Sequence, residues 1–202
     1  MPRQARISIP DIPYHITQRG NFKENIFDED ADREVYLDLF FAYSLEYGLK
    51  VYAWCLMDNH IHFVVEPQSK NSMWKVFKSL NTRYSHYLNK KRAKRGQLWQ
   101  GRFYSCPLDE FHFYEAVRYV ELNPIRANMV TLIKDYKWSS SYKRLGQASN
   151  YVICSVDTYF SVSSWIDYLN EGVNRGMQLR IKQNTMSGKP LGSQQFSEKH
   201  SF

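Results

Sequence analysis

The sequence predicts an α+β fold, in which an antiparallel sheet has its helices packed on one face. Segments with strand character and segments with helical periodicity follow one another in the order βαββαβα. The chain has 202 residues, of which 16% are aromatic, so it is long enough and apolar enough to bury one core. Together these observations favour one α+β domain with an appendage at its C-terminal end.

The first half of the chain supplies three strands and one helix. Residues 13–21 form a predicted strand that ends in a Gly-Asn turn signal. Residues 28–47 have apolar side chains at helical spacing and acidic side chains in the first turn, and Gly48 is a stop signal. Residues 49–57 are rich in Val, Tyr, Trp and Leu. The turn signal Asp58-Asn59 follows, so we expect a hairpin with the strand after it.

The second half supplies two helices and the fourth strand. A helix is predicted from Ser72, its candidate cap, to about residue 91. The glycine-bounded loop 96–102 leads into a strand at residues 103–108. Asp109 is a candidate cap for the third helix, which should end near Asn123 because Pro124 disfavours helical geometry in the residue before it. This order folds most simply as the ferredoxin-like arrangement.

Two histidines stand one residue apart in the predicted strand after the hairpin turn. Side chains alternate along a strand, so His60 and His62 share one face with backbones roughly 7 Å apart, while Ile61 points to the other face. This geometry can hold one ion. An isolated pair of this kind is also common as polar residues on a half-solvated strand, so the pair alone does not identify a metal site.

The third helix supplies a candidate ligand and a candidate nucleophile. Tyr119 and Asn123 are four residues apart and project from one helical face, whereas Tyr114 lies on the opposite side from Asn123. The Asn side-chain oxygen is a reasonable ligand for a hard divalent ion. The Tyr hydroxyl can form a phosphate ester that conserves bond energy for rejoining. The alternative is that Tyr119 packs in the core, as one of 15 tyrosines.

The positive charge of the chain is concentrated in one segment. The formal net charge is +7, and residues 67–108 contain ten Lys or Arg with no Asp or Glu. Aromatic side chains are interleaved with these cations. Such a segment suits a phosphate backbone with exposed bases better than it suits solubility alone, so it favours nucleic acid as the partner.

Other classes of protein are disfavoured by composition. No apolar run approaches the roughly 18 residues that span a bilayer, and the N-terminal residues lack a signal-peptide core, so we expect a cytoplasmic protein without membrane attachment. The three cysteines, Cys55, Cys106 and Cys154, are far apart and fit neither a disulfide framework nor a CxxC knuckle. We expect them to be small buried apolar residues.

The histidine-hydrophobic-histidine (HUH) strand with a downstream Tyr-x-x-x-Asn-Pro helix resembles the single-tyrosine HUH transposases of the insertion-sequence (IS200-like) type, and most of all their REP-associated tyrosine transposase branch. The resemblance covers most of residues 10–145. It rests on HITQRGN at 15–21, MDNHIH at 57–62, LWQGRF at 98–103, YVELNPIRA at 119–127 and WSSSY at 138–142.

The resemblance implies a function for four of these residues. His60 and His62 match the metal-binding histidines, and Tyr119 matches the tyrosine that attacks single-stranded DNA to give a 5′-phosphotyrosine and a free 3′-hydroxyl. Asn123 stands where many relatives carry a Gln ligand. The implied cofactor is Mg²⁺ or Mn²⁺, and the implied partners are single-stranded DNA with a hairpin and, in many relatives, a second copy of the chain. The catalytic domain would span residues 1–146.

Candidate DNA contacts come from the basic segment and the ends of neighbouring strands: Arg19, Lys75, Lys78, Arg83, Lys90, Lys91, Arg92, Lys94, Arg95, Trp99 and Arg102. Arg19 and Arg102 are equally plausible as structural ion-pair residues. Besides a nicking and strand-transfer enzyme, two functions stay open. One is a nucleic-acid-binding protein that no longer cuts, and the other is a metal-dependent hydrolase, for which further ligands and a hydrolytic base are missing from the sequence.

The C-terminal extension, residues 147–202, is less informative. It is expected to be partly helical, with an amphipathic face at Trp165, Tyr168 and Leu169, and to end in a flexible tail from residue 194. Longer relatives have a similar segment to GKPLG at residues 188–192. This segment either reads DNA or docks on the domain as a structural tail.

Overall fold

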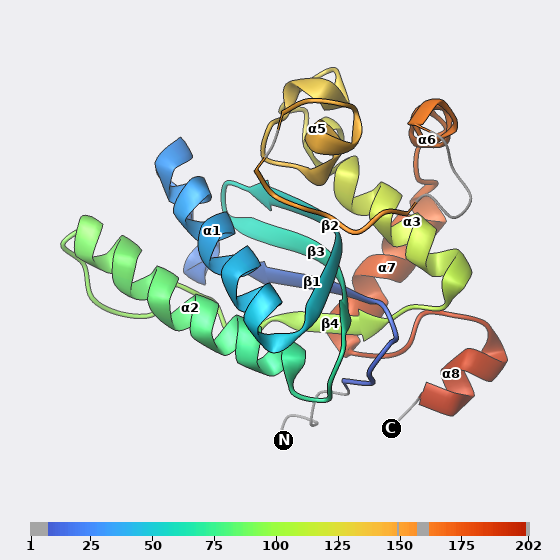
Figure 1. Ribbon diagram of the computed structural model, residues 1–202, viewed down its shortest axis with the longest axis horizontal. Helices are drawn as coiled ribbons and strands as arrows, with labels where there is room; N and C mark the ends of the chain where they lie inside the picture. Colours follow the sequence, from blue (N-terminus) through green and yellow to red (C-terminus); the bar gives the residue numbers. More distant parts are fainter. Residues whose placement is uncertain (1–7, 149, 157–161, 201–202) are drawn as a thin grey trace.

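The computed structural model describes residues 8–148, 150–156 and 162–200. Four strands, β1 (Tyr14–Arg19), β2 (Leu49–Met57), β3 (His60–Pro67) and β4 (Tyr104–Pro107), form one sheet in the order β2-β3-β1-β4 (Figure 1). All neighbouring strands are antiparallel. This is the strand order of the ferredoxin-like arrangement, so the predicted fold class is confirmed.

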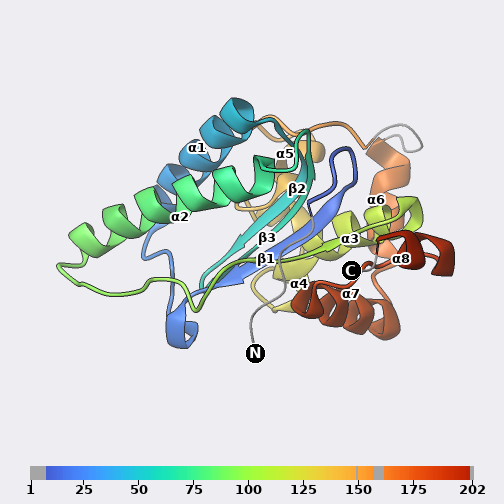
Figure 2. The same ribbon diagram turned by 90° about the horizontal axis from the view of Figure 1, so that it is seen from below.

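Helices cover both faces of the sheet. Figure 2 shows α1 (Asp30–Tyr47) and α2 (Ser72–Lys91) on one face, with α3 (Glu110–Glu121), α4 (Asn123–Arg126) and α7 (Arg175–Ser187) on the other. The prediction that the helices share one face is therefore wrong. Its physical reason lies in β1 and β3, whose side chains are mostly buried on both sides, so that each face needs a cover.

Aromatic side chains build the core between the sheet and the helices α1 and α2. Phe63 of β3 stacks on Phe40 of α1 with ring centroids 4.0 Å apart. Tyr36 and Tyr84 meet edge to face at 4.9 Å and join α1 to α2. Contacts of this type add to the burial of their large apolar surfaces. This face is thus the apolar core of the domain.

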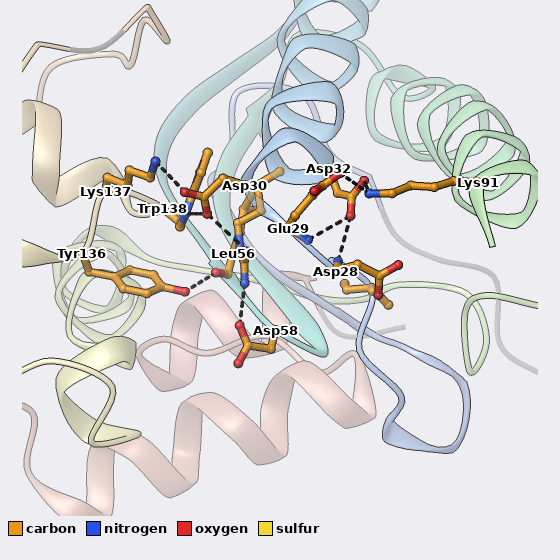
Figure 3. A network of polar contacts seen from close by, with 12 residues as sticks. Asp28, Glu29, Asp30, Asp32, Leu56, Asp58, Lys91, Tyr136, Lys137 and Trp138 are labelled. Carbon is orange, nitrogen blue, oxygen red and sulfur yellow. Dashed lines mark hydrogen bonds and ion pairs between the residues drawn. The ribbon is translucent and has the colours of Figure 1, made fainter.

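The start of α1 is fixed by a network of charged and polar contacts (Figure 3). Glu29 and Asp32 form a capping box, and Lys91 at the end of α2 contacts both carboxylates at 2.6 Å. Asp30 accepts from Trp138 at 2.9 Å, and Tyr136 nearby donates to the carbonyl of Leu56 at 2.7 Å. The start of α1 is therefore joined to α2 and to the chain after α4, which in turn contacts β2.

The helix ends agree with the sequence signals in two of three cases. Gly48 ends α1 with φ of 66°, the left-handed conformation that favours glycine. Asp109 caps α3 by accepting from the backbone N–H of His112 at 2.9 Å. Ser72 is not the cap of α2. It is the first residue of that helix, and its hydroxyl accepts from the backbone N–H of Ser69 at 3.0 Å.

Later segments of the chain cover both edges of the sheet. The N–H of Leu56 in edge strand β2 donates to the carbonyl of Trp138, and Cys154 donates to Val51. At the other edge, the N–H of Leu191 donates to the carbonyl of Pro107 in β4 at 2.9 Å. Covered edges do not offer free backbone groups to another chain. The GKPLG segment, which contains Leu191, is accordingly docked on the sheet.

The remaining helices are α5 (Ser140–Arg144), α6 (Val162–Asn170) and α8 (Gln194–His200), with 3₁₀ turns at Asn21–Lys23 and Ile133–Asp135. The structure has α8 where a flexible tail was expected, and the hydroxyl of Ser193 accepts from the N–H of Phe196 at the start of this helix. Residues 201–202 lie outside the described residues. In the described part of the chain, no helix is both long and apolar enough to cross a membrane.

The aromatic core predicts a large loss of stability on truncation of Phe63. Replacing Phe63, which is fully buried, with Ala should lower the free energy of unfolding by about 3–5 kcal/mol because it leaves a cavity. Urea denaturation of the purified variant measures this change. The control, Leu45→Ala in α1, removes a side chain that is 88% exposed and should change stability by no more than about 0.5 kcal/mol.

Candidate active site

The two histidines of β3 lie on the face of the sheet that α3 covers. The hairpin turn at Asp58 and Asn59 places His60 at the first position of the strand, and alternation puts His62 on the same side. Their ring centroids are 5.0 Å apart, with the rings nearly perpendicular. Nδ1 of His60 lies 2.7 Å from the side-chain oxygen of Asn59, so the turn residue also orients the first ring.

A third histidine, which the sequence reasoning missed, belongs to the same cluster. His15 of β1 stacks on His62 with ring centroids 5.3 Å apart, and its Nε2 lies 3.1 Å from Nδ1 of His62. The register of β1 on β3 pairs Thr17 with His62, so His15 is a diagonal neighbour of His62 on the same face. Alternation alone could have assigned His15 to a face, but its nearness to His62 required the strand pairing.

Tyr119 packs against this cluster from α3 of the same chain. Its ring meets His62 edge-on at 5.7 Å and His15 at 5.6 Å. A second missed residue, Arg126, lies with its guanidinium carbon 4.1 Å from the centroid of the Tyr119 ring and donates to the carbonyl of Tyr119. The predicted nucleophile and the histidine pair are therefore brought together within one chain, with a cation beside them.

Burial and nearby cations keep the three histidines neutral at pH 7. Burial, with a contribution from Arg126, lowers the pKa of His15 to about 3. Burial and the charges of Arg19 and Arg126 lower the pKa of His60 to about 4, and burial together with the neighbouring histidines lowers the pKa of His62 well below its usual value. Neutral imidazoles are the form that binds metals.

The hydrogen bonds of His60 and His62 to neighbouring side chains use the same ring nitrogen. Each ring uses Nδ1 for a neighbouring side chain, Asn59 or His15, which leaves Nε2 for a further partner. Within residues 8–148, 150–156 and 162–200, no three His, Cys, Asp or Glu side chains are grouped to hold an ion. The residues present thus fit an ion that takes two imidazoles and completes its coordination with oxygen.

Asn123 is buried one helical turn after Tyr119. Its amide nitrogen donates to the carbonyl of Tyr119 at 3.0 Å, and more weakly to that of Val120. In the part of the chain described, the side-chain hydrogen bonds of Asn123 go to the backbone of α3 and not to the histidines. The structure does not join Asn123 directly to the histidine pair, although its side-chain oxygen is not used by these bonds.

The helix that carries Tyr119 is anchored by a buried carboxylate at its end. Glu121 is fully buried and accepts from Ser140 at 2.8 Å, from Arg144 at 3.0 Å and from the indole N–H of Trp165 at 3.0 Å. Breaking a buried ion pair of this kind usually costs several kcal/mol. The contacts hold α3 against α5 and α6, and so they fix the position of Tyr119 over the sheet.

The basic segment lies largely on the opposite face of the sheet, along α2 and the loop after it. Two of its cations are held by carboxylates at and just before the start of α1: Lys91 pairs with Glu29 and Asp32, and Arg92 pairs with Asp28. Of the other predicted DNA contacts, most are exposed: Arg19, Lys75, Lys78, Arg83, Lys90, Lys94, Arg95 and Arg102.

Trp99 does not have the exposure that a base-stacking side chain needs. It is only 8% exposed and packs near the rings of Tyr36 and Tyr84. We therefore treat Trp99 as a core residue. Its loop still matters for the site, because Gln100 donates its N–H to the carbonyl of Arg19, the residue that pairs with His60 in the sheet.

Comparison with known proteins identifies the family. A sequence profile described as "Transposase IS200 like" matches residues 8–123. The chain belongs to the IS200-like transposase family. The matched region of this transposase contains His15, the histidine pair, Tyr119 and Asn123, and it ends before Arg126 and the extension. The predicted family is confirmed.

The solved structures that match this chain are distant from it in sequence. A REP-associated tyrosine transposase bound to a REP hairpin matches with a TM-score of 0.62 and 15% identity, over 80% of this chain and 96% of that chain. A putative transposase from Deinococcus radiodurans R1 matches with a TM-score of 0.42 and 14% identity, over 59% of this chain and 95% of that one. A search of the curated proteins gave no match.

The lowered histidine pKa values predict a stability that falls as the pH is lowered from 7 to 5. An unfolded histidine with a pKa near 6.5 takes up a proton in this range, whereas buried His15, with a pKa of about 3, does not. Protons therefore favour the unfolded state, by about 1.4 kcal/mol per pH unit below 6.5 for such a histidine. Urea unfolding in EDTA at several pH values measures the slope. His15→Gln should reduce it, and an unchanged slope would contradict the assignment.

Proposed function

We propose that this IS200-like transposase cuts and rejoins single-stranded DNA through a covalent link to Tyr119. The observation that carries the proposal is the packing of the Tyr119 ring edge-on against His62. The guanidinium carbon of Arg126 lies 4.1 Å from the centroid of the same ring. A tyrosine that only fills the core does not require two neutral histidines and the guanidinium of Arg126 around its ring. Because Tyr119 lies beside His62 within one chain, we propose that a single chain supplies both.

In the proposed reaction the phenol oxygen of Tyr119 attacks the scissile phosphorus. The bond from phosphorus to the 3′ oxygen breaks, and a 5′-phosphotyrosine remains. The phenol loses one proton and the leaving 3′ oxygen gains one to become a hydroxyl, so the step is balanced. Attack by another 3′-hydroxyl reverses the step and releases the tyrosine, so no external energy source is needed. The positive charges of Arg126 and Arg19 would favour the phosphate at this place.

His60 and His62 would hold a divalent ion through Nε2, with the side-chain oxygen of Asn123 as a further candidate ligand. When bound, Mg²⁺ or Mn²⁺ would supply charge that polarises a phosphate oxygen and stabilises the leaving oxygen. The chain itself keeps both imidazoles neutral and oriented, as their lowered pKa values and their Nδ1 contacts indicate.

The proposed substrate is a DNA hairpin joined to a single strand. The structurally similar REP-associated tyrosine transposase was solved with a REP hairpin, which supports a hairpin for this chain. The exposed cations of α2 and the following loop, together with Arg102, offer a surface for the phosphate backbone. The loop reaches Arg19 beside His60, so DNA held on this surface has a path to the proposed catalytic site.

Replacing Tyr119 with Phe should abolish covalent capture of DNA and leave DNA binding within about twofold, because only the nucleophilic oxygen is removed. The assay incubates labelled hairpin oligonucleotides carrying single-stranded flanks with protein and Mn²⁺, and detects the adduct on a denaturing gel. Tyr114→Phe, on the opposite side of α3 from Asn123, is the matched control and should retain the adduct. Undiminished adduct formation by Tyr119→Phe would sink the proposal, and binding without any adduct in the parent protein would favour a non-cutting DNA-binding protein.

Replacing either histidine should weaken the binding of Mn²⁺ in the absence of DNA by at least about 10–100-fold. That range is typical when a residue that hydrogen-bonds to a metal ligand is lost, and loss of the ligand itself should cost more. Titration of His60→Ala and His62→Ala with Mn²⁺, followed by electron paramagnetic resonance, measures the affinity. His112→Ala is the control because His112 pairs with Asp109 at the start of α3. Equal affinity in all three variants would rule out the histidine pair as the metal site.

A further inference from the structure

A buried chain of hydrogen bonds runs from the C-terminal helix α7 to the histidine pair. The hydroxyl of Thr185 lies 2.7 Å from the carbonyl of Ile181 and 2.7 Å from Nδ1 of His15. Nε2 of His15 lies 3.1 Å from Nδ1 of His62. Thr185 and His15 are each only 1% exposed, so water does not compete for these bonds.

The contacts of Thr185 fix which atoms donate and which accept along this series of hydrogen bonds. A carbonyl oxygen can only accept, so the hydroxyl of Thr185 donates its one proton to Ile181. The Thr185 oxygen then accepts from Nδ1–H of His15. The thiol of Cys106, 3.3 Å away, can use the remaining lone pair of the same oxygen.

The same donor and acceptor order extends through the rings of His15 and His62. One proton bridges the two ring nitrogens, so one ring must donate and the other accept. Because His15 carries its proton on Nδ1, its Nε2 accepts, and Nδ1 of His62 donates. His62 is then left with an unprotonated Nε2. The opposite direction would place a proton on Nε2 of His62, where it would block coordination.

We infer that Thr185 is a positioning residue for the proposed metal site, which sets the tautomer of His62 through His15. The inference rests on the proposed function in taking His62 as a ligand. Thr185 lies outside residues 8–123, the region matched by the family profile. The C-terminal extension therefore supplies a hydrogen bond to the histidine cluster. Packing of α7 against β4 and β1 gives this link its rigid support.

The tautomers can be read directly in the metal-free protein. Long-range ¹H–¹⁵N correlation spectra separate protonated from unprotonated ring nitrogens of each histidine. Nε2 of both His15 and His62 should be unprotonated, with the proton on Nδ1. A proton on Nε2 of His62 in the parent protein would overturn the inference, whatever the protein does to DNA.

Variants of Thr185 test its control over the rings. Thr185→Val keeps the shape and removes the hydroxyl, so both histidines should show mixed tautomers and Mn²⁺ affinity should fall about 10–100-fold. Thr185→Ser should restore both readouts. Cys106→Ala, which removes a neighbour of the same oxygen, should leave the tautomers of His62 unchanged.

The outcomes separate this inference from the proposed function. Unchanged His62 tautomers in a folded Thr185→Val protein would overturn the role of Thr185. If that variant does not fold, the spectra of the parent protein and of Thr185→Ser decide the matter, because loss of the predicted tautomers in the Ser variant would also contradict it. Failure of the parent protein to form a DNA adduct would remove the proposed function and leave the tautomer result standing.

Discussion

The pairing of β1 with β3 is the constraint on which the rest of the structure depends. Its register sets Thr17 opposite His62, and thereby brings His15 beside His62. Side chains alternate with a period of two, so a slip by one residue would turn the histidines into the apolar core and Phe63 out of it. The same register thus determines the aromatic core and the polar cluster at once.

The two faces of the sheet have different tasks. The face covered by α1 and α2 is packed with aromatic rings, such as Phe40 against Phe63 and Tyr36 against Tyr84. The opposite face, covered by α3 and α7, holds histidines that satisfy one another and the hydroxyl of Thr185. Polar groups buried in this way are costly unless every partner is present, which ties the order of the site to the packing of both helices.

The nearness of Tyr119 to the histidine pair was predicted only through the resemblance to the HUH transposases. Local patterns in the sequence were enough for most of the elements and for the hairpin. These features depend on short spacings, such as the alternation at His60 and His62. The sequence did not reveal His15 or Thr185 as parts of the cluster, because their contacts span 47 and 170 residues of chain. Helices on both faces were missed for the same reason.

The sequence also predicted only in part which cations of the basic segment are free to bind an anionic partner. The basic segment has no acidic residue of its own, but Lys91 and Arg92 find their partners at the start of α1, about 60 residues earlier. Trp99 was misread because an aromatic residue in a glycine-bounded loop can point either to solvent or to the core. Only the packed structure decides between these orientations.

The covered edge of β4 has a consequence for how the protein is made. During synthesis His15 emerges early, whereas Thr185 and the covering Leu191 emerge more than 150 residues later, so the sheet keeps one open edge and an unordered histidine until then. A product that ends before α7 would carry Tyr119 and the proposed metal ligands His60 and His62 without the hydroxyl of Thr185. The contact between Thr185 and His15, which we propose to order His62, therefore forms only after α7 has been synthesised.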